Sequence, residues 1–193
     1  AMLLRNQMSL LAFCFALFVG VVVVAVELTE EQHEHLPDFG DPKVAARLKC
    51  SACRASALEA FDALMELRTK RGGTRKIKEH EYAELMETMC EDRIGQYGLQ
   101  LRSNLPTQKF SKDKSISRAQ GNWAGRYIMN ICGELTTDYE DALITNQFHN
   151  LAHFIETMCV REMQVCDRRS VKDETLGDEL TAEFHEMLQD AEL

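Results

Sequence analysis

Apolar residues recur at helical intervals in four stretches of the chain. Within each stretch they fall three, four or seven positions apart, which places them on one face of an α-helix. The stretches are Leu58, Phe61, Leu64 and Met65; Tyr82, Leu85, Met86, Met89 and Cys90; Trp123, Tyr127, Ile128, Ile131, Cys132 and Leu135; and Leu151, Phe154, Ile155, Met158 and Cys159. After the first 26 residues no run alternates β-branched or aromatic residues with polar ones, so strands are not expected. The pattern predicts an all-α domain of four to five helices.

The connections between these stretches are polar or contain glycine. Gly72 and Gly73 separate the first helix, expected over about 45–68, from the second. The stretch from Leu99 to Gly121 is polar and contains Pro106, so we expect it to be a linker. Residues 136–138 (Thr, Thr and Asp) supply caps for the last of the four helices.

The chain after residue 168 differs in character from the rest. From Asp173 onward it carries eight acidic residues and no Lys or Arg. Its apolar side chains lie four apart, at Leu176, Leu180, Phe184 and Leu188. We therefore predict a domain over residues 45–168, followed by an acidic C-terminal segment, 169–193, that forms a short amphipathic helix.

A long apolar run lies near the start of the chain. It extends from Leu10 to Val26 and follows Arg5. Only Cys14 and Gly20 interrupt its aliphatic and aromatic residues. Such a run with small residues near its end is typical of a secretory signal peptide, and we place the cleavage site near Ala25. The alternative is an uncleaved anchor, for which the run is short. The interpretation is a signal peptide over 1–25 and an acidic N-terminal segment over 26–44, with no stable membrane span after cleavage.

Charge and cysteine content narrow the function. The chain has 22 Lys and Arg against 31 Asp and Glu, a formal net charge of −9, which argues against nucleic-acid binding. Without Cys14, six cysteines remain: Cys50, Cys53, Cys90, Cys132, Cys159 and Cys166. An even number in a secreted chain predicts three disulfides, although six cysteines allow about 15 pairings. Zinc binding is the competing use.

Cys50-Ser-Ala-Cys53 also has the spacing of a thioredoxin-type redox pair. Catalysis would need one of these thiols near a helix N-terminus, where its pKa falls. The expected helix start fits, but no strand precedes the motif. A structural role is favoured, and a thiol–disulfide oxidoreductase using Cys50 and Cys53 remains the alternative.

The cysteine-bearing motifs resemble those of the canopy family, which has a saposin-like fold, and within it the marginal-zone B-cell-specific proteins of the endoplasmic reticulum. The resemblance rests on Arg47-Leu-Lys-Cys-Ser-Ala-Cys-Arg-Ala55, Cys90-Glu-Asp-Arg-Ile-Gly-Gln-Tyr-Gly98, Arg126-Tyr-Ile-Met-Asn-Ile-Cys132 and the Cys159–Cys166 pair. It implies the nested disulfides Cys50–Cys166, Cys53–Cys159 and Cys90–Cys132. Cys159 and Cys166 would lie about 10 Å apart along a helix, against about 4.5 Å for Cys50 and Cys53. The last helix is therefore expected to end soon after Cys159.

The resemblance also implies a function, a folding factor in the lumen of the endoplasmic reticulum. Its partners would be secretory clients and an Hsp90-class chaperone, and it would need no cofactor. The last residues, Asp190, Ala191, Glu192 and Leu193, match a retrieval signal at their final two positions, so partial secretion is also expected. A saposin-like lipid binder is the third, less favoured reading.

Three further groups of residues are candidates for sites. Six basic residues without an acid form a candidate docking patch for an acidic partner: Arg68, Lys70, Arg71, Arg75, Lys76 and Lys78. His149 and His153 have a metal-binding spacing but no evident third ligand, and His33, Glu34 and His35 lie in the acidic N-terminal segment. No metal site is predicted.

Overall fold

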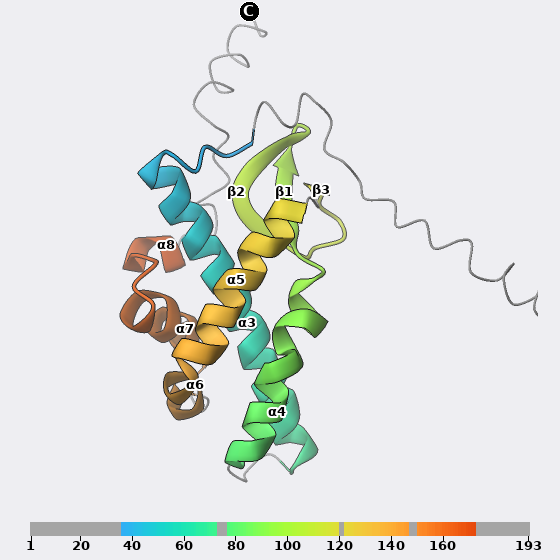
Figure 1. Cartoon of the computed structure of the whole chain (residues 1–193), viewed down its shortest axis with the longest axis vertical. Coiled ribbons are helices and arrows are strands. Elements are labelled where there is room, and N and C mark those ends of the chain that lie inside the picture. The colour runs from blue at the N-terminus through green and yellow to red at the C-terminus, as the bar shows by residue number, and fades with distance from the viewer. Residues whose placement is uncertain (1–35, 73–76, 120–121, 147–149, 173–193) are drawn as a thin grey trace, which may run out of the picture.

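The computed structural model describes residues 36–72, 77–119, 122–146 and 150–172, and its centre is one long helix, α3 (Pro42–Lys70). The sheet lies at one end of α3 and α4 at the other, while α6, α7 and α8 lie along one side (Figure 1). Asp41 caps the start of α3 by accepting a bond from the Lys43 amide at 2.8 Å, and Pro42 stands in the first turn. Gly72, in the left-handed region at φ 87°, follows the helix end.

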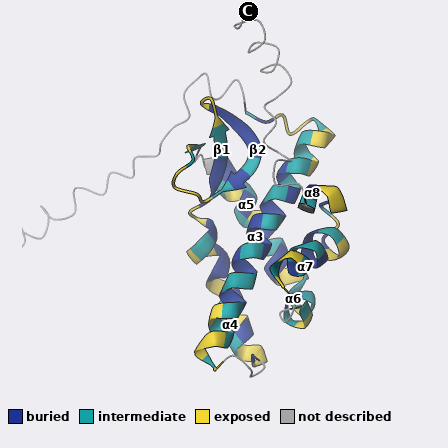
Figure 2. Cartoon of the chain, turned by 180° about the vertical axis from the view of Figure 1, so that it is seen from behind, coloured by how far each residue is buried: buried dark blue, intermediate teal, exposed yellow. Residues whose placement is uncertain are grey.

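The buried face of α3 consists largely of small residues. Ala52, Ala60 and Ala63 are buried, whereas Leu58 and Phe61 of the expected apolar stripe are only half-buried. The reason is that other elements pack on several sides of this helix, and small side chains let their backbones approach closely. The buried core follows α3 through the molecule, with exposed residues on the outer turns (Figure 2).

The remaining helices follow the predicted order. They are α4 (Glu79–Met89), which continues as the π-helical turn η1 (Cys90–Ile94); α5 (Asn122–Asp138); α6 (Glu140–Asn146); α7 (Leu151–Glu156), which continues as the π-helical turn η2 (Thr157–Glu162); and α8 (Arg168–Lys172). The predicted disulfide-stapled helical domain is confirmed in that the described residues are mostly helical, but the all-α class is not, because the domain also contains a three-stranded sheet. The short helices α6 and α8 were not predicted.

The prediction that residues 99–121 form a linker without strands is wrong. This stretch contains β1 (Gly98–Arg102), β2 (Leu105–Ser111) and β3 (Arg118–Ala119), in the antiparallel order β2-β1-β3. Leu99, Leu105 and Phe110 are buried, so the sheet contributes to the core. Burial against α3 stabilises strands whose own sequence carries little β-propensity.

Three disulfides join the helices, and they are the nested pairs that the resemblance implies. Cys50–Cys166, Cys53–Cys159 and Cys90–Cys132 have Cα–Cα distances of 4.8, 5.9 and 5.9 Å. The helix does end soon after Cys159, as predicted: Gln164 has φ 53°, and the amides of Val165 and Cys166 both donate to the Cys159 carbonyl at 3.0 Å. This reversal brings both late cysteines onto the N-terminal half of α3.

Packing also extends to residues on either side of the 45–168 range. The ring of Phe39 lies 5.2 Å from that of Trp123 on α5, measured between centroids. On the other side, Arg54 Nη1 of α3 donates to the Ser170 carbonyl of α8 at 3.2 Å. The folded unit therefore includes residues from both flanking segments.

Candidate functional site

A cleft of about 580 Å³ opens between α3, β2 and α7. Apolar or aromatic side chains form part of its lining: Ala55, Leu58, Tyr97, Phe110 and Ile155. Charged side chains are also present, namely Arg54, Lys109, Lys112 and Asp113, together with the polar Ser51, Gln96 and Ser111. The described residues of the cleft thus combine apolar surface with more cationic than anionic groups.

The helical period of α3 explains its share of the cleft. Ser51, Arg54, Ala55 and Leu58 lie at i, i+3, i+4 and i+7, which is one face of the helix. Ser51 Oγ accepts a hydrogen bond from the Phe110 amide at 2.9 Å. Because β2 is an edge strand, this bond satisfies a backbone donor that no neighbouring strand pairs, and it fixes β2 against α3.

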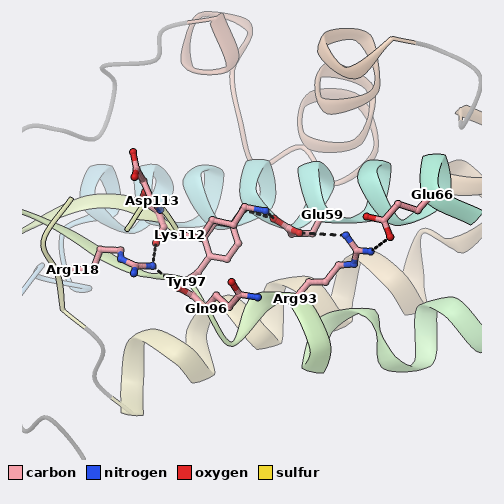
Figure 3. Close-up of polar contacts among 9 residues, drawn as sticks. Glu59, Glu66, Arg93, Gln96, Tyr97, Lys112, Asp113 and Arg118 are labelled. Carbon is pink, nitrogen blue, oxygen red and sulfur yellow. Dashed lines mark hydrogen bonds and ion pairs between the residues drawn. The ribbon is translucent and has the colours of Figure 1, made fainter. Parts of the chain in front are cut away.

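A buried carboxylate holds the β2 side of the cleft to α3 (Figure 3). Glu59 is only 2% exposed, and its Oε1 accepts a hydrogen bond from Tyr97 Oη at 2.7 Å and another from Lys112 Nζ. Its Oε2 lies 3.9 Å from Arg93 Nη1, and Arg93 Nη2 donates to Glu66 Oε2 at 2.7 Å. The ammonium of Lys112 also lies 5.9 Å from the centroid of the Tyr97 ring. Glu59 therefore accepts two hydrogen bonds, from Tyr97 and Lys112, and lies within ion-pair distance of a third group, Arg93.

Burial and these contacts shift the pKa of several groups. The hydrogen bond from Arg93 lowers the pKa of Glu66, and the same bond raises the pKa of Arg93. Burial, followed by the nearby Glu59 charge, raises the pKa of Asp62. Burial and the bond to Glu59 raise the pKa of Tyr97, which therefore stays a neutral donor at physiological pH.

The cleft rim continues from β2 into a tight turn. Asp113 Oδ1 accepts bonds from the Ser115 amide and hydroxyl, both at 2.8 Å, and these bonds lower the pKa of Asp113. Arg118 Nη1 donates to the Gln96 carbonyl at 2.6 Å, which ties β3 to the turn before Tyr97 (Figure 3). The Asp113 carboxylate is thus engaged within its own turn, while Lys112, with a side chain 42% exposed, lies at the cleft edge.

The other side of the cleft is attached covalently. Cys50 and Cys53, on α3, are bonded to Cys166 and Cys159, which bracket the reversal after η2. Cys53 and Cys159 are both fully buried. The two cysteines of the candidate redox motif are thus each joined to a distant partner, and neither presents a free thiol in this structure.

The basic cluster is only partly within the described residues. Arg71 forms an ion pair with Glu81 of α4, and Arg68 Nη1 donates to Met65 Sδ at 3.6 Å. The Lys78 amide donates to Glu81 Oε2 at 3.1 Å, so an acid that follows the cluster in sequence lies against it. Lys70 and Lys78 are exposed, and positions 75 and 76 lie outside the described residues.

The remaining sequence predictions concern segments that the structure does not describe. The signal peptide, His33, Glu34, His35, His149, the 173–193 segment and its final four residues all lie outside the described residues. Within the described ranges no three His, Cys, Asp or Glu residues are grouped as a metal site. Among the same residues, no helix has both the length and the apolar character needed to cross a membrane.

Sequence reasoning missed the Glu59 network and the cleft. One available signal was the position of Glu59 itself, which shares a helical face with Ala52, Ala55 and Ala63. A charge on an otherwise small and apolar helical face indicates a buried, paired group. Its partners, Tyr97 and Lys112, come from a stretch expected to be a linker, so the pairing could not be inferred.

Comparisons with known proteins gave no match: no family model, no curated protein and no solved structure matches this chain. The resemblance to the canopy family therefore depends on the motifs and cysteine positions of the sequence.

Proposed function

We propose that this protein is a lumenal folding factor of the canopy family, and that its cleft binds exposed segments of immature secretory proteins. The observation that carries the proposal is the cleft between α3, β2 and α7, which joins apolar surface to cationic side chains. Its volume of about 580 Å³ is that of a ligand-sized site. Leu58 and Ile155 would contact an apolar side chain of the client, and Lys109 a neighbouring carboxylate.

The disulfides support a lumenal location. Buried disulfides persist in oxidising compartments and are rare in the cytosol. Cys53–Cys159 lies in the core and fixes α3 to η2, so the frame of the cleft depends on oxidation. The observed pairing is the one that the family resemblance implies, which supports the family proposal as well. Retention through the final residues, Asp190 to Leu193, is part of this proposal.

The basic cluster is the surface that we propose for the chaperone partner. Its described members, Arg68, Lys70, Arg71 and Lys78, lie at the end of α3 and just before α4, and the sheet lies at the opposite end of α3 (Figure 1). An acidic surface of an Hsp90-class chaperone would complement its charge. The test reverses Lys70, Arg75 and Lys76 to Glu and keeps Arg71, because Arg71 pairs with Glu81. Weaker capture of the chaperone at low salt, with unchanged thermal stability, is expected; equal capture contradicts this docking site.

The cleft is tested by its effect on client aggregation. The full-length mature chain is mixed with a reduced, unfolded secretory protein, and light scattering follows aggregation. Leu58→Gln places an amide in the cleft, and Leu67→Gln is the matched control on the same helix, packed against the core outside the cleft. Leu58→Gln should reduce the suppression of aggregation, whereas Leu67→Gln should lower stability more than it affects suppression.

Two results would contradict the proposed function. One is a wild-type chain that neither delays aggregation nor binds the unfolded client. The other is equal suppression by Leu58→Gln and wild type, which would place client binding elsewhere on the molecule.

A further inference from the structure

The cleft is lined by several cationic side chains, although the chain as a whole is acidic. Arg54, Lys109 and Lys112 line one cleft, and among the described residues that line it the one carboxylate, Asp113, is bonded to Ser115. Lys112 is paired with Glu59, yet its side chain is 42% exposed at the cleft edge. The chain as a whole carries a net charge of −9, and residues 173–193 hold eight carboxylates and no Lys or Arg. The most acidic stretch of the sequence and a cation-rich cleft therefore belong to one molecule.

Helix α8 places the start of this acidic segment beside the cleft. Arg54, a cleft residue, donates from Nη1 to the Ser170 carbonyl at 3.2 Å. Asp167 Oδ1 caps α8 by accepting bonds from the Ser170 amide at 2.6 Å and its hydroxyl at 2.9 Å. Asp173 follows Ser170 by three residues, which span about 10 Å at most. The segment thus leaves the folded domain within reach of the cleft.

The acidic segment also carries apolar residues that could pack against the apolar lining of the cleft. Leu176, Leu180, Phe184 and Leu188 are spaced to share one helical face, with carboxylates between them. Leu58 and Ile155 are half-buried side chains in the cleft that such a face would cover. An amphipathic helix in an apolar groove, flanked by opposite charges, is a common mode of peptide recognition.

We propose that residues 173–193 bind in the cleft of their own chain and compete there with clients. The inference rests on the proposed function only in taking the same cleft as the client site. Because the segment is tethered next to the cleft, its effective concentration reaches the millimolar range, so even a weak contact is well occupied. A client must displace it, which lowers the apparent affinity of the cleft in proportion to the fraction occupied.

Zero-length cross-linking of the full-length mature chain tests the contact. A water-soluble carbodiimide activates a carboxylate, an amine displaces the activated group to form an amide, and the carbodiimide leaves as its urea. Lys109 and Lys112 should couple to carboxylates of 173–193, as mass spectrometry of the digest would show. Lys43 and Lys114, exposed and outside the cleft, are the matched controls. A Lys49–Glu134 link shows that the reaction proceeds, since those groups are partly exposed and lie 3.6 Å apart outside the cleft.

Mixing ¹⁵N-labelled and unlabelled protein assigns each link to one chain or two. Links within single chains, concentrated at Lys109 and Lys112 and lost at high salt, are the expected result. Links spread equally over the control lysines, or formed between chains, would overturn the inference.

A client-binding measurement separates this inference from the proposed function. Asp178→Asn, Glu179→Gln, Glu183→Gln and Glu186→Gln together should tighten client binding about two- to tenfold, because exposed pairs contribute little each. Unchanged client affinity with no tail cross-links refutes the docked tail and leaves the proposed function standing. Specific tail cross-links in a chain that binds no client refute the function and leave the docked tail.

Discussion

The two walls of the cleft are attached to α3 by different chemistry. The wall near α7 is joined by two disulfides, Cys50–Cys166 and Cys53–Cys159, which neither salt nor moderate pH changes. The β2 wall is joined by the polar contacts of Glu59 and the bond from the Phe110 amide to Ser51. The first wall depends on the redox state of its compartment, and the second on charge. The cleft keeps its shape only where both conditions are met.

The covalent wall should show the largest effect when it is broken. Replacing Cys53 and Cys159 together with Ala leaves no free thiol but removes a fully buried bond that closes a long loop. We expect a loss of about 2–5 kcal/mol in the free energy of unfolding, measured by urea denaturation at pH 7. A loss below about 1 kcal/mol would mean that packing alone holds η2 to α3.

Breaking the polar wall should lower the free energy of unfolding by less, and Glu59 is the residue to replace. Glu59→Gln retains an acceptor for Tyr97 but removes the charge that Lys112 and Arg93 face. Because both cations are partly exposed and can turn to water, the expected cost is about 1–3 kcal/mol. Glu66→Gln is the matched control, since Glu66 is exposed, and should cost less than about 1 kcal/mol. Equal losses for the two variants would show that Glu59 does not organise this wall.

The stability of the polar wall should depend on pH, and replacing Asp62 tests the direction of that dependence. Burial raises the pKa of Asp62 in the fold, so its contribution to stability is full below its unfolded pKa and is lost as pH rises through the folded value. Asp62→Asn should therefore raise stability at pH 7, by about 0.5 kcal/mol, and have less effect near pH 3. Glu66 has the opposite sign: its lowered pKa contributes stability that is lost on acidification. Thermal melts at both pH values test this, and a destabilised Asp62→Asn at pH 7 contradicts it.

The smallest predicted effect is a local loss of stability in α8, next to the covalent wall. The Asp167 carboxylate caps α8 through Ser170, and these bonds lower the pKa of Asp167. Asp167→Ala should therefore speed hydrogen exchange at the amides of residues 170–172. The free energy of local opening there should fall by about 1 kcal/mol or less. Exchange elsewhere should not change, because Cys166 remains bonded to Cys50. Faster exchange throughout α3 would mean that α8 is integral to the frame.

The sequence predicted most of the covalent wall and little of the polar one. Strong 3.6-residue patterns marked the main helices, whereas the disulfide pairing came from the resemblance to the canopy family. Given that pairing, the separation of Cys159 from Cys166 indicated the reversal after η2. The strands were not predicted because Pro106 and Lys109 interrupt any β-pattern. Proline is tolerated in β2 because β2 is an edge strand. The Glu59 contacts join residues far apart in sequence, and no spacing rule relates them.

Mapping of client contacts on the ¹⁵N-labelled full-length chain is the most direct test of the central claim, that the cleft binds unfolded client. A reduced, unfolded secretory polypeptide is titrated into the protein, and backbone amide shifts are followed. We predict shifts at Leu58, Lys109, Phe110 and Ile155, reduced in Leu58→Gln and unaffected in Leu67→Gln. Shifts confined to the basic cluster, or no shifts at concentrations that suppress aggregation, would contradict the account.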